Sequence, residues 1–460
     1  MLSMERTRKL EIATASVRKF AQVGSTSRAA NLLTKFRAAD IVVIVEGLGS
    51  TDRLGVWKGL RELDSRLASD VLTEMPDKLA TSILTQLSPS DVGAVLRSVP
   101  VDDAAHLVSL LPEELVDDLR EDEDQEKTIS PELAGHLAYA EETAGRLMTT
   151  NLLALPEQMT VGEATRSLQE RADQFEMVFY LYVVDDRRHL VGVLSLRQLL
   201  LNPSSTPLRR IMADDVIRVR TDADQEEVAQ MIARYNLLAV PVVDDENRLV
   251  GLITVDDAID VLREEATEDI YALAGVAVEE RIGGSPIRSI QLRLPWIYVN
   301  LLTATLSVTV IHLFEGTIAE VVALATLMPI ASGMGGNAAT QALTVVVRGL
   351  AMGELSGTSN ARVLAKEVIV GLGLGVGAGL AGALIAAWWF GNPVLGLLLG
   401  LALLVNMIVA AVAGTAVPLG LRGLGLDPAA GASVFVTACT DMTGFAAFLG
   451  LATMFLSYLK

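Results

Sequence analysis

The sequence contains one cysteine, Cys439, in 460 residues and only four histidines, and this scarcity excludes several chemistries. A lone cysteine cannot build an intramolecular disulfide framework or a cysteine-based zinc site. From residue 290 onward the only histidine is His312, which disfavours a zinc or copper centre in that half. The chain also lacks a phosphate-binding glycine loop, a nucleophile with a neighbouring base and metal-hydrolase spacing. We therefore expect that the protein is not an enzyme.

Basic residues are also few compared with acidic residues. The chain has 37 lysines and arginines against 56 acids, which gives a formal net charge of −19. From Arg293 onward six acids balance six bases, so the whole negative charge lies in the first part of the chain. Such a surface argues against nucleic-acid binding, and it either attracts cations or serves only solubility. Hydrophobic residues make up 51% of the chain, so an acidic soluble half precedes a nearly neutral apolar half.

The N-terminus lacks the apolar core of a signal peptide. Its first twenty residues, MLSMERTRKLEIATASVRKF, carry charges throughout. We therefore expect the acidic half to stay in the cytoplasm.

Residues 1–130 read as an acidic domain of short helical repeats that form a superhelix. Four prolines, at 76, 89, 100 and 112, are spaced by 13, 11 and 12 residues, and each precedes an acid and an apolar pattern. Proline suits the first turn of a helix, and acids there complement the helix dipole. The acidic run DDLREDEDQE, at 117–126, is expected to close this domain as a linker or solvated turn.

Residues 140–263 contain an internal repeat, with copies at about 140–205 and 206–263. YLYVVDDRRHLVGVLSL in the first copy matches AVPVVDDENRLVGLITV in the second, and Met148 and Met212 mark corresponding positions. Each copy predicts a helix, a strand, a tight turn, a strand and a helix. The pair resembles tandem CBS domains, an α/β regulatory module.

Residues 289–460 read as an α-helical membrane domain of five spans. The apolar runs cover about 290–313, 317–347, 362–390, 393–421 and 431–458. Each is long enough for a hydrocarbon core about 30 Å thick. With the acidic half in the cytoplasm, the bases between spans lie inside, as the positive-inside rule requires. This predicts a multi-pass protein of the cell (inner or plasma) membrane with its C-terminus outside. Residues 264–288 are expected to form a connecting helix before the first span.

The most costly residues within or beside the spans are few, and Asp441 is the most costly of them. No base lies near it in sequence, so its partner is either a cation in transit or a hydrogen-bonding neighbour helix. Asn337 and Gln341 are four apart and share a helix face, Asn406 lies in the fourth span, and Asp427 precedes the fifth. Oxygen ligands suit Mg²⁺, Ca²⁺ or Mn²⁺, and hydrated Mg²⁺ needs only one or two carboxylates. A symmetric homodimer would supply a second Asp441 at a shared axis.

In this order of parts, the stretches EEATEDIYALAGV, PIASGMGGNAATQAL, GLDPAAGAS and TDMTGF resemble the MgtE family of magnesium channels. The resemblance covers nearly the whole chain and is weaker over residues 1–130. It implies a homodimeric Mg²⁺-selective channel whose pore carboxylate is Asp441, with Asp427 near the cytoplasmic mouth and Asn337 in the pore. It also implies that the connecting helix plugs the pore from inside.

The family's gating implies that intracellular Mg²⁺ bridges acids of the soluble domains, removes their repulsion and shuts the pore. The matching positions in this chain are Asp102, Asp224, Glu226, Asp257, Asp260, Glu265, Glu268 and Asp269. Each of these acids, taken singly, is also consistent with a solvated helix face. Asn236 and His106 stand where some members carry an acid, which would weaken individual sensing sites.

CBS pairs often bind adenine nucleotides, so ATP binding is a hypothesis for this chain. The ribose-contacting pattern is present in the second copy as Thr254 and Asp257, whereas the first copy has Ser195 and Gln198 and lacks the acid. The alternative to a channel is a proton-coupled secondary transporter of Mg²⁺, Co²⁺ or Mn²⁺, in which Asp441 exchanges a proton.

Overall fold

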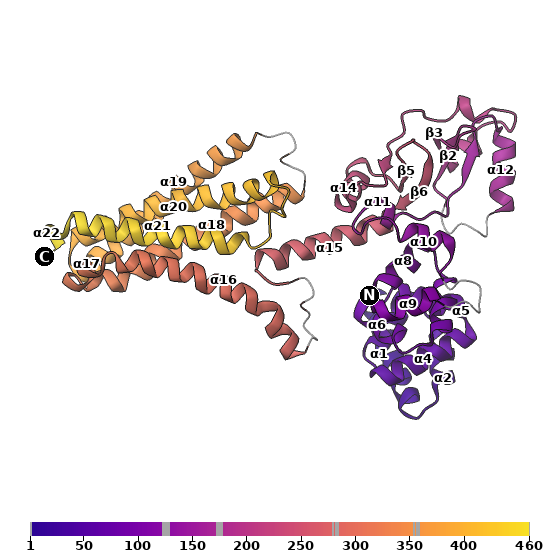
Figure 1. Cartoon of the computed structure of the whole chain (residues 1–460), viewed down its shortest axis with the longest axis horizontal. Coiled ribbons are helices and arrows are strands. Elements are labelled where there is room, and N and C mark those ends of the chain that lie inside the picture. The colour runs from indigo at the N-terminus through magenta and orange to yellow at the C-terminus, as the bar shows by residue number, and fades with distance from the viewer. Residues whose placement is uncertain are drawn as a thin grey trace. The chain divides into compact units, whose positions relative to one another are not determined.

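The computed structural model describes residues 2–121, 129–171, 178–277, 280, 285–352, 355 and 359–459. The chain divides into two compact units, residues 1–261 and 262–460 (Figure 1). The first unit holds a helical domain followed by two small sheets with their helices, and the second is a bundle of long helices. Most of the acidic run at 117–126 lies outside the described residues.

The first unit begins with nine helices that pack on one another. Their bounds are α1 (Leu2–Gln22), α2 (Thr26–Leu33), α3 (Ala38–Glu46), α4 (Ser50–Leu63), α5 (Ser65–Thr73), α6 (Asp77–Leu84), α7 (Pro89–Leu96), α8 (Val101–Ser109) and α9 (Glu113–Glu121). The expectation of short helices describes all of them except α1, which runs for 21 residues. No proline occurs before residue 76, and α1 ends two residues before Gly24, whose φ of +72° cannot continue a right-handed helix.

The proline repeat sets the starts of α6 to α9. Pro76 and Pro100 are the residues before the first turns of α6 and α8, Pro89 is the first residue of α7, and Pro112 directly precedes α9. A proline has no N–H to leave unpaired in a first turn, which is why it is tolerated at these positions.

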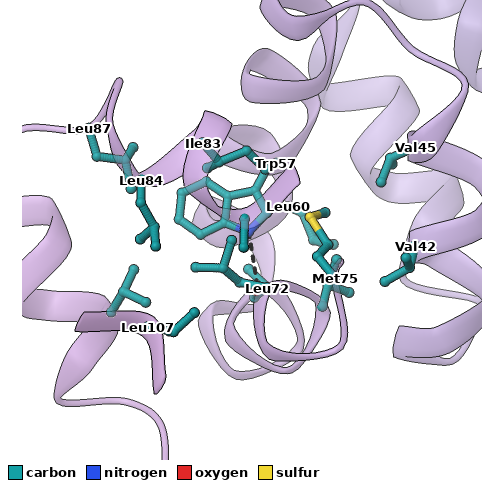
Figure 2. Close-up of a cluster of buried hydrophobic side chains, with 14 of the residues drawn as sticks. Val42, Val45, Trp57, Leu60, Leu72, Met75, Ile83, Leu84, Leu87 and Leu107 are labelled. Carbon is teal, nitrogen blue, oxygen red and sulfur yellow. Dashed lines mark hydrogen bonds between the residues drawn. The ribbon is translucent and has the colours of Figure 1, made fainter. Parts of the chain in front are cut away.

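A continuous hydrophobic core joins these helices (Figure 2). Trp57 of α4 lies among Leu60, Leu72 and Ile83, and its indole N–H donates to the carbonyl of Ala68 at 2.9 Å. This bond satisfies the polar edge of a side chain that is otherwise buried, so the indole contributes its full apolar area to the core.

Two sheets of matching topology follow. The helices α10 (Pro131–His136) and α11 (Ala144–Leu147) precede them. The first copy contains β1 (Ala154–Pro156), α12 (Val161–Glu170), β2 (Tyr180–Val184), β3 (Leu190–Ser195) and α13 (Leu196–Leu201). The second contains the 3₁₀ turn η2 (Leu208–Arg210), β4 (Val219–Arg220), α14 (Gln225–Tyr235), β5 (Ala239–Val243), β6 (Leu249–Thr254) and α15 (Val255–Leu273). In each sheet the central strand pairs parallel with the first strand and antiparallel with the third.

Each copy contributes one methionine that packs on a glycine of the other copy. Met212 of the second copy packs on Gly192 of β3, and Met148 of the first packs on Gly251 of β6. Neither glycine has room for a Cβ atom under the methionine side chain. The repeated methionine and glycine positions of the sequence are therefore two halves of one reciprocal contact between the copies.

The helix α15 runs from the second copy into the second unit and ends at Leu273, where Gly275 adopts a φ of +64°. Of the connecting helix expected over 264–288, the residues up to 273 are helical. Residues 278, 279 and 281–284 of that segment lie outside the described residues.

The second unit is built from long helices. Their bounds are α16 (Pro286–His312), α17 (Glu315–Glu320), α18 (Ala323–Ala351), α19 (Asn360–Phe390), α20 (Pro393–Gly423), α21 (Ala432–Met454) and α22 (Leu456–Leu459). Within the described residues, four of them, α16, α19, α20 and α21, are both long and apolar enough to cross a membrane.

The helix α18 is long enough to span, with 29 residues, but it is not among those four. Its central turns carry Ser332, Asn337, Thr340 and Gln341, which lower its hydropathy. The second expected span is also interrupted, because α17 ends at Glu320 before α18 begins. The count of five spans therefore stays a prediction.

The helices α19 and α20 pack closely through glycines. Gly371, Gly375 and Gly379 recur every four residues on the buried face of α19, and a Cβ on any of them would collide with α20. Small residues at this spacing allow the close backbone approach that stabilises helix pairs in lipid.

Candidate ion site and its carboxylates

Asp441 lies in the middle of α21 and is partly buried against α18. The hydroxyl of Ser332, 109 residues earlier in the chain, donates to Asp441 Oδ1. No base forms an ion pair with Asp441 in the part of the chain that the structure describes. A hydroxyl donor orients the carboxylate without neutralising its charge, so the group stays available to a cation.

Asn337 and Gln341 lie on an exposed stripe of α18. Met334 and Val345 share this stripe, with 40% and 53% of their surfaces exposed. No hydrogen bond joins Asn337 to Asp441 in the described chain, so the role of Asn337 in the pore stays a prediction.

Asp427 lies in the turn between α20 and α21. Its Oδ1 atom accepts the backbone N–H of Ala429 at 2.8 Å. Asp269 of α15 lies close to it: burial, together with the charges of Asp427 and Glu265, raises the pKa of Asp269 to about 6. The structure thus places three of the predicted acids near one another, at the end of the bundle where α21 begins.

The end of α15 packs on this part of the bundle. Ala272 and Leu273 contact a buried cluster that contains Leu343 and Val347 of α18, as well as Ala429 and Ala432 at the start of α21. These apolar contacts hold α15 against the helix ends, while Asp269 and Asp427 bring like charges to the same place.

A tryptophan of α16 secures the same region. The ring of Trp296 covers Gly431, the residue before α21, and also contacts Gly275 after α15. Gly431 has a φ of +62° and no room for a Cβ atom against the indole. Both conditions require glycine there, so the start of α21 and the end of α15 are held through one aromatic side chain.

A second group of acids lies in the first unit. Asp102 of α8 is largely buried, and its Oδ1 atom has no hydrogen-bond partner among the described residues. Burial, followed by the charges of Asp103 and Asp257, raises the pKa of Asp102 to about 7. Burial also raises the pKa of Asp257, and Asp256 and Asp260 contribute to that shift. A buried carboxyl beside further acids is destabilising unless a proton or a cation compensates the charge.

Asp224 and Glu226 make hydrogen bonds at the start of α14. Asp224 caps α14, where its Oδ1 atom accepts the backbone N–H groups of Glu226 at 2.8 Å and Glu227 at 3.3 Å. Glu226 in turn accepts a hydrogen bond from Gln230 at 3.0 Å. Glu268 is exposed on α15.

The two positions that depart from the family pattern also have local contacts. Asn236 ends α14 with a φ of +51°, a left-handed conformation that asparagine tolerates better than most residues. His106 Nε2 lies 3.4 Å from Asp77 Oδ1.

The proposed nucleotide residues form a helix cap. Thr254 Oγ1 donates to Asp257 Oδ2 at 2.5 Å at the start of α15. In the first copy Ser195 and Gln198 form the equivalent capping box of α13. The two copies therefore share a backbone arrangement, and the second adds a carboxylate.

Two acids in the second unit were missed from sequence. Glu367 of α19 is buried, with 8% of its side chain exposed, and lies 3.1 Å from Lys366 Nζ. It borders a cavity of about 250 Å³ between α18, α19 and α20. The spacing of Glu367 could have predicted its burial from sequence, because it lies four residues before Gly371 on the glycine face of α19. Glu280 pairs with Arg293 at 3.1 Å and accepts a bond from Ser289, and these contacts lower the pKa of its carboxyl.

The described residues contain no group of three or more histidine, cysteine, aspartate or glutamate side chains able to enclose a metal ion. They offer pairs of carboxylates instead. Such pairs suit a hydrated hard cation, which keeps most of its water shell, better than a dehydrated ion in a full protein cage.

Comparison with known families gives three matches along the chain. The MgtE model, described as a divalent cation transporter, matches residues 328–451. The CBS domain model matches residues 144–204 and 208–264, and the MgtE intracellular N domain matches residues 36–142.

Whole proteins of the same kind are similar over most of their length. The magnesium transporter MgtE of Enterococcus faecalis is 39% identical over 70% of this chain and 71% of its own length. MgtE of Thermus thermophilus is 39% identical over 69% and 71% of the respective chains. The crystal structure of the soluble part of a magnesium transporter aligns with a TM-score of 0.49 and 31% identity, covering 56% of this chain and 99% of that one.

Proposed function

Since the chain belongs to the MgtE family of magnesium transporters, we propose that it is a Mg²⁺-selective channel. It mediates Mg²⁺ uptake across the cell membrane as a homodimer, with the acidic half in the cytoplasm and the C-terminus outside. The observation that carries the proposal is Asp441, a carboxylate in a spanning helix that is oriented by Ser332 and has no basic partner in the described chain.

In this mechanism two copies of Asp441, one from each chain, flank a hydrated Mg²⁺ ion. Retained water spares most of the cost of dehydrating the ion, and the two carboxylates offset what remains. The exposed stripe of α18 that carries Asn337 supports a second chain at this face, because polar side chains in a membrane helix normally face protein or water. Asp427 lies at the cytoplasmic mouth and raises the local cation concentration.

Gating follows from the two groups of acids. At Asp102, Asp257 and Asp269, burial and neighbouring acids raise the pKa and so disfavour the charged carboxylate. Intracellular Mg²⁺ compensates these charges and stabilises the arrangement in which the end of α15 plugs the mouth. At low Mg²⁺ the acids repel, α15 leaves the mouth and the pore opens.

Recordings of the full-length protein in planar bilayers test this function. With the inner face held at neutral pH, we expect unitary Mg²⁺ currents that do not change when a pH gradient is imposed by altering the pH of the outer face. Millimolar Mg²⁺ should close the pore only from the side that carries the acidic half. Flux that follows the pH gradient without resolvable unitary currents would instead support the proton-coupled transporter.

The second CBS copy is proposed to bind ATP, with Asp257 accepting the ribose hydroxyls and Thr254 orienting that carboxylate. The bond between Thr254 and Asp257 supports this assignment, since it holds the acid in one rotamer. In titration calorimetry of the full-length protein, Thr254→Val should weaken ATP binding by about tenfold, the effect of one bond to a charged group. Ser195→Ala, at the matching position of the first copy, should leave the affinity unchanged. Equal affinities for all three proteins would contradict the assignment.

A further inference from the structure

A polar side chain without an assigned role is completely buried in the bundle. Asn406 of α20 has 0% of its surface exposed. Its helix packs on both α18 and α21 (Figure 1). Its Nδ2 atom donates to the backbone carbonyl of Ala331 in α18 at 2.8 Å. Its Oδ1 atom has no hydrogen-bond partner in the described residues. An alanine or leucine would fill this position without the cost of burying an unpaired amide oxygen.

Glycines on both neighbouring helices make room for this amide. A Cβ atom on Gly335 of α18 or on Gly444 of α21 would collide with the Asn406 side chain. Gly444 also lies against the backbone of Ala331 and Ser332. The amide therefore occupies a fixed position between two helices, with its N–H directed at one carbonyl.

That carbonyl belongs to the residue before Ser332, whose hydroxyl donates to Asp441. A displacement of α18 by about 1 Å at Ala331 would stretch the Ser332 bond beyond hydrogen-bonding distance. Asn406 thus bonds to α18 at the residue next to Ser332. With α18 in this position, the Ser332 hydroxyl lies within hydrogen-bonding reach of the Asp441 carboxylate.

We infer that Asn406 is a positioning residue for the ion site: it holds α18 so that Ser332 orients Asp441, and this orientation sets the apparent affinity for Mg²⁺. The inference rests on the proposed role of Asp441. Asn406 itself does not contact the ion.

The test measures Mg²⁺ flux into liposomes at a series of Mg²⁺ concentrations. Asn406→Leu keeps the branched shape and the number of heavy atoms of the side chain and removes the donor. We expect it to raise the Mg²⁺ concentration for half-maximal flux by about tenfold, because the hydrogen bond from Ser332 to the charged Asp441 is lost as a consequence. Ser332→Ala should produce the same shift. Maximal flux reports the number of folded channels, whereas the half-saturating concentration reports the site.

The double variant distinguishes positioning from general packing. If Asn406 acts through Ser332, the double variant should also shift by about tenfold, because the second change removes nothing further. An additive shift of about a hundredfold would overturn the inference, as would an unchanged half-saturating concentration in Asn406→Leu. Thr415→Val is the matched control: Thr415 is equally buried on α20, but its hydroxyl bonds only within its own helix, to Ala411.

Two further variants keep the outcome decisive. Should Asn406→Leu fail to fold, Asn406→Ala removes the same donor and fits the space, and the same shift is expected of it. Asp441→Asn is measured in parallel. Full transport by that variant would refute the proposed ion site and this inference with it, whereas loss of transport together with a wild-type half-saturating concentration in the Asn406 variants would refute the inference alone.

Discussion

Asp441→Asn is expected to reduce Mg²⁺ uptake to the level of protein-free liposomes. The substitution keeps the size of the side chain and its ability to accept the Ser332 hydroxyl, so it removes the charge and little else. A divalent ion at the centre of a bilayer needs compensation for the water it gives up, and an amide oxygen supplies far less than a carboxylate. In a homodimer each substitution acts twice at the axis, so the loss should exceed that of a single charge. The measurement is flux of Mg²⁺ into liposomes that contain equal amounts of each protein.

Cys439→Ser is the control for this experiment. Cys439 lies two residues before Asp441 on the same helix and is exposed, and the change to serine preserves its size. It should transport at the wild-type rate. Uptake by Asp441→Asn at a comparable rate would show that the charge of Asp441 is not required for transport.

Local chemistry made part of this molecule predictable. The prolines predicted the starts of four helices because the effect of a proline ring on the backbone is confined to its own turn. The repeat containing Met148 and Met212 predicted two equivalent strand pairs, and the structure contains both. Asp441 could be selected from cost alone, since an acid in an apolar helix is expensive wherever the helix packs.

What stayed hidden depends on contacts between distant residues. Nothing in the sequence links Ser332 to Asp441, or Trp296 to Gly431, because each contact arises only when helices pack. The resemblance pointed to Asp102, but its burial beside Asp257 required the folded domain. The break between Glu320 and Ala323 was missed because the apolar run VVALATLM reads as one continuous helix.

The second large effect concerns the acids at the end of α15. Glu265→Gln, Glu268→Gln and Asp269→Asn, combined in one protein, should leave the channel mostly closed at low intracellular Mg²⁺. The reason is that Ala272 and Leu273 keep their apolar contacts with the bundle, whereas the repulsion between Asp269 and Asp427 is removed. Bilayer recordings with Mg²⁺ varied on the inner face would show a low open probability that no longer depends on Mg²⁺.

The raised pKa of Asp269 predicts the direction in which pH changes channel closure. Burial, Asp427 and Glu265 raise the pKa of Asp269 from 3.8 to about 6 when α15 is docked, so docking promotes proton uptake by this carboxyl. Ionisation therefore opposes docking fully at pH 7. The opposition weakens as the pH falls through about 6, and it is absent below the ordinary pKa of 3.8. Acidifying the inner face from neutral pH to about one unit below the raised pKa of Asp269 should close the wild-type channel without Mg²⁺. The triple variant should be unaffected.

A matched control separates this local repulsion from the net charge of the whole domain. Glu62, Glu74 and Glu113 are exposed on the helical domain, and changing all three to glutamine removes the same number of charges. That protein should keep wild-type closure by Mg²⁺ and by acid, because salt screens exposed charges and weakens their long-range effect. If instead both triple variants lose Mg²⁺ sensitivity equally, gating depends on total charge, and the particular place of Asp269 beside Asp427 has no special role. If neither triple variant loses Mg²⁺ sensitivity, the acids at the end of α15 do not control the plug. Closure must then depend on the buried pair of Asp102 and Asp257 alone.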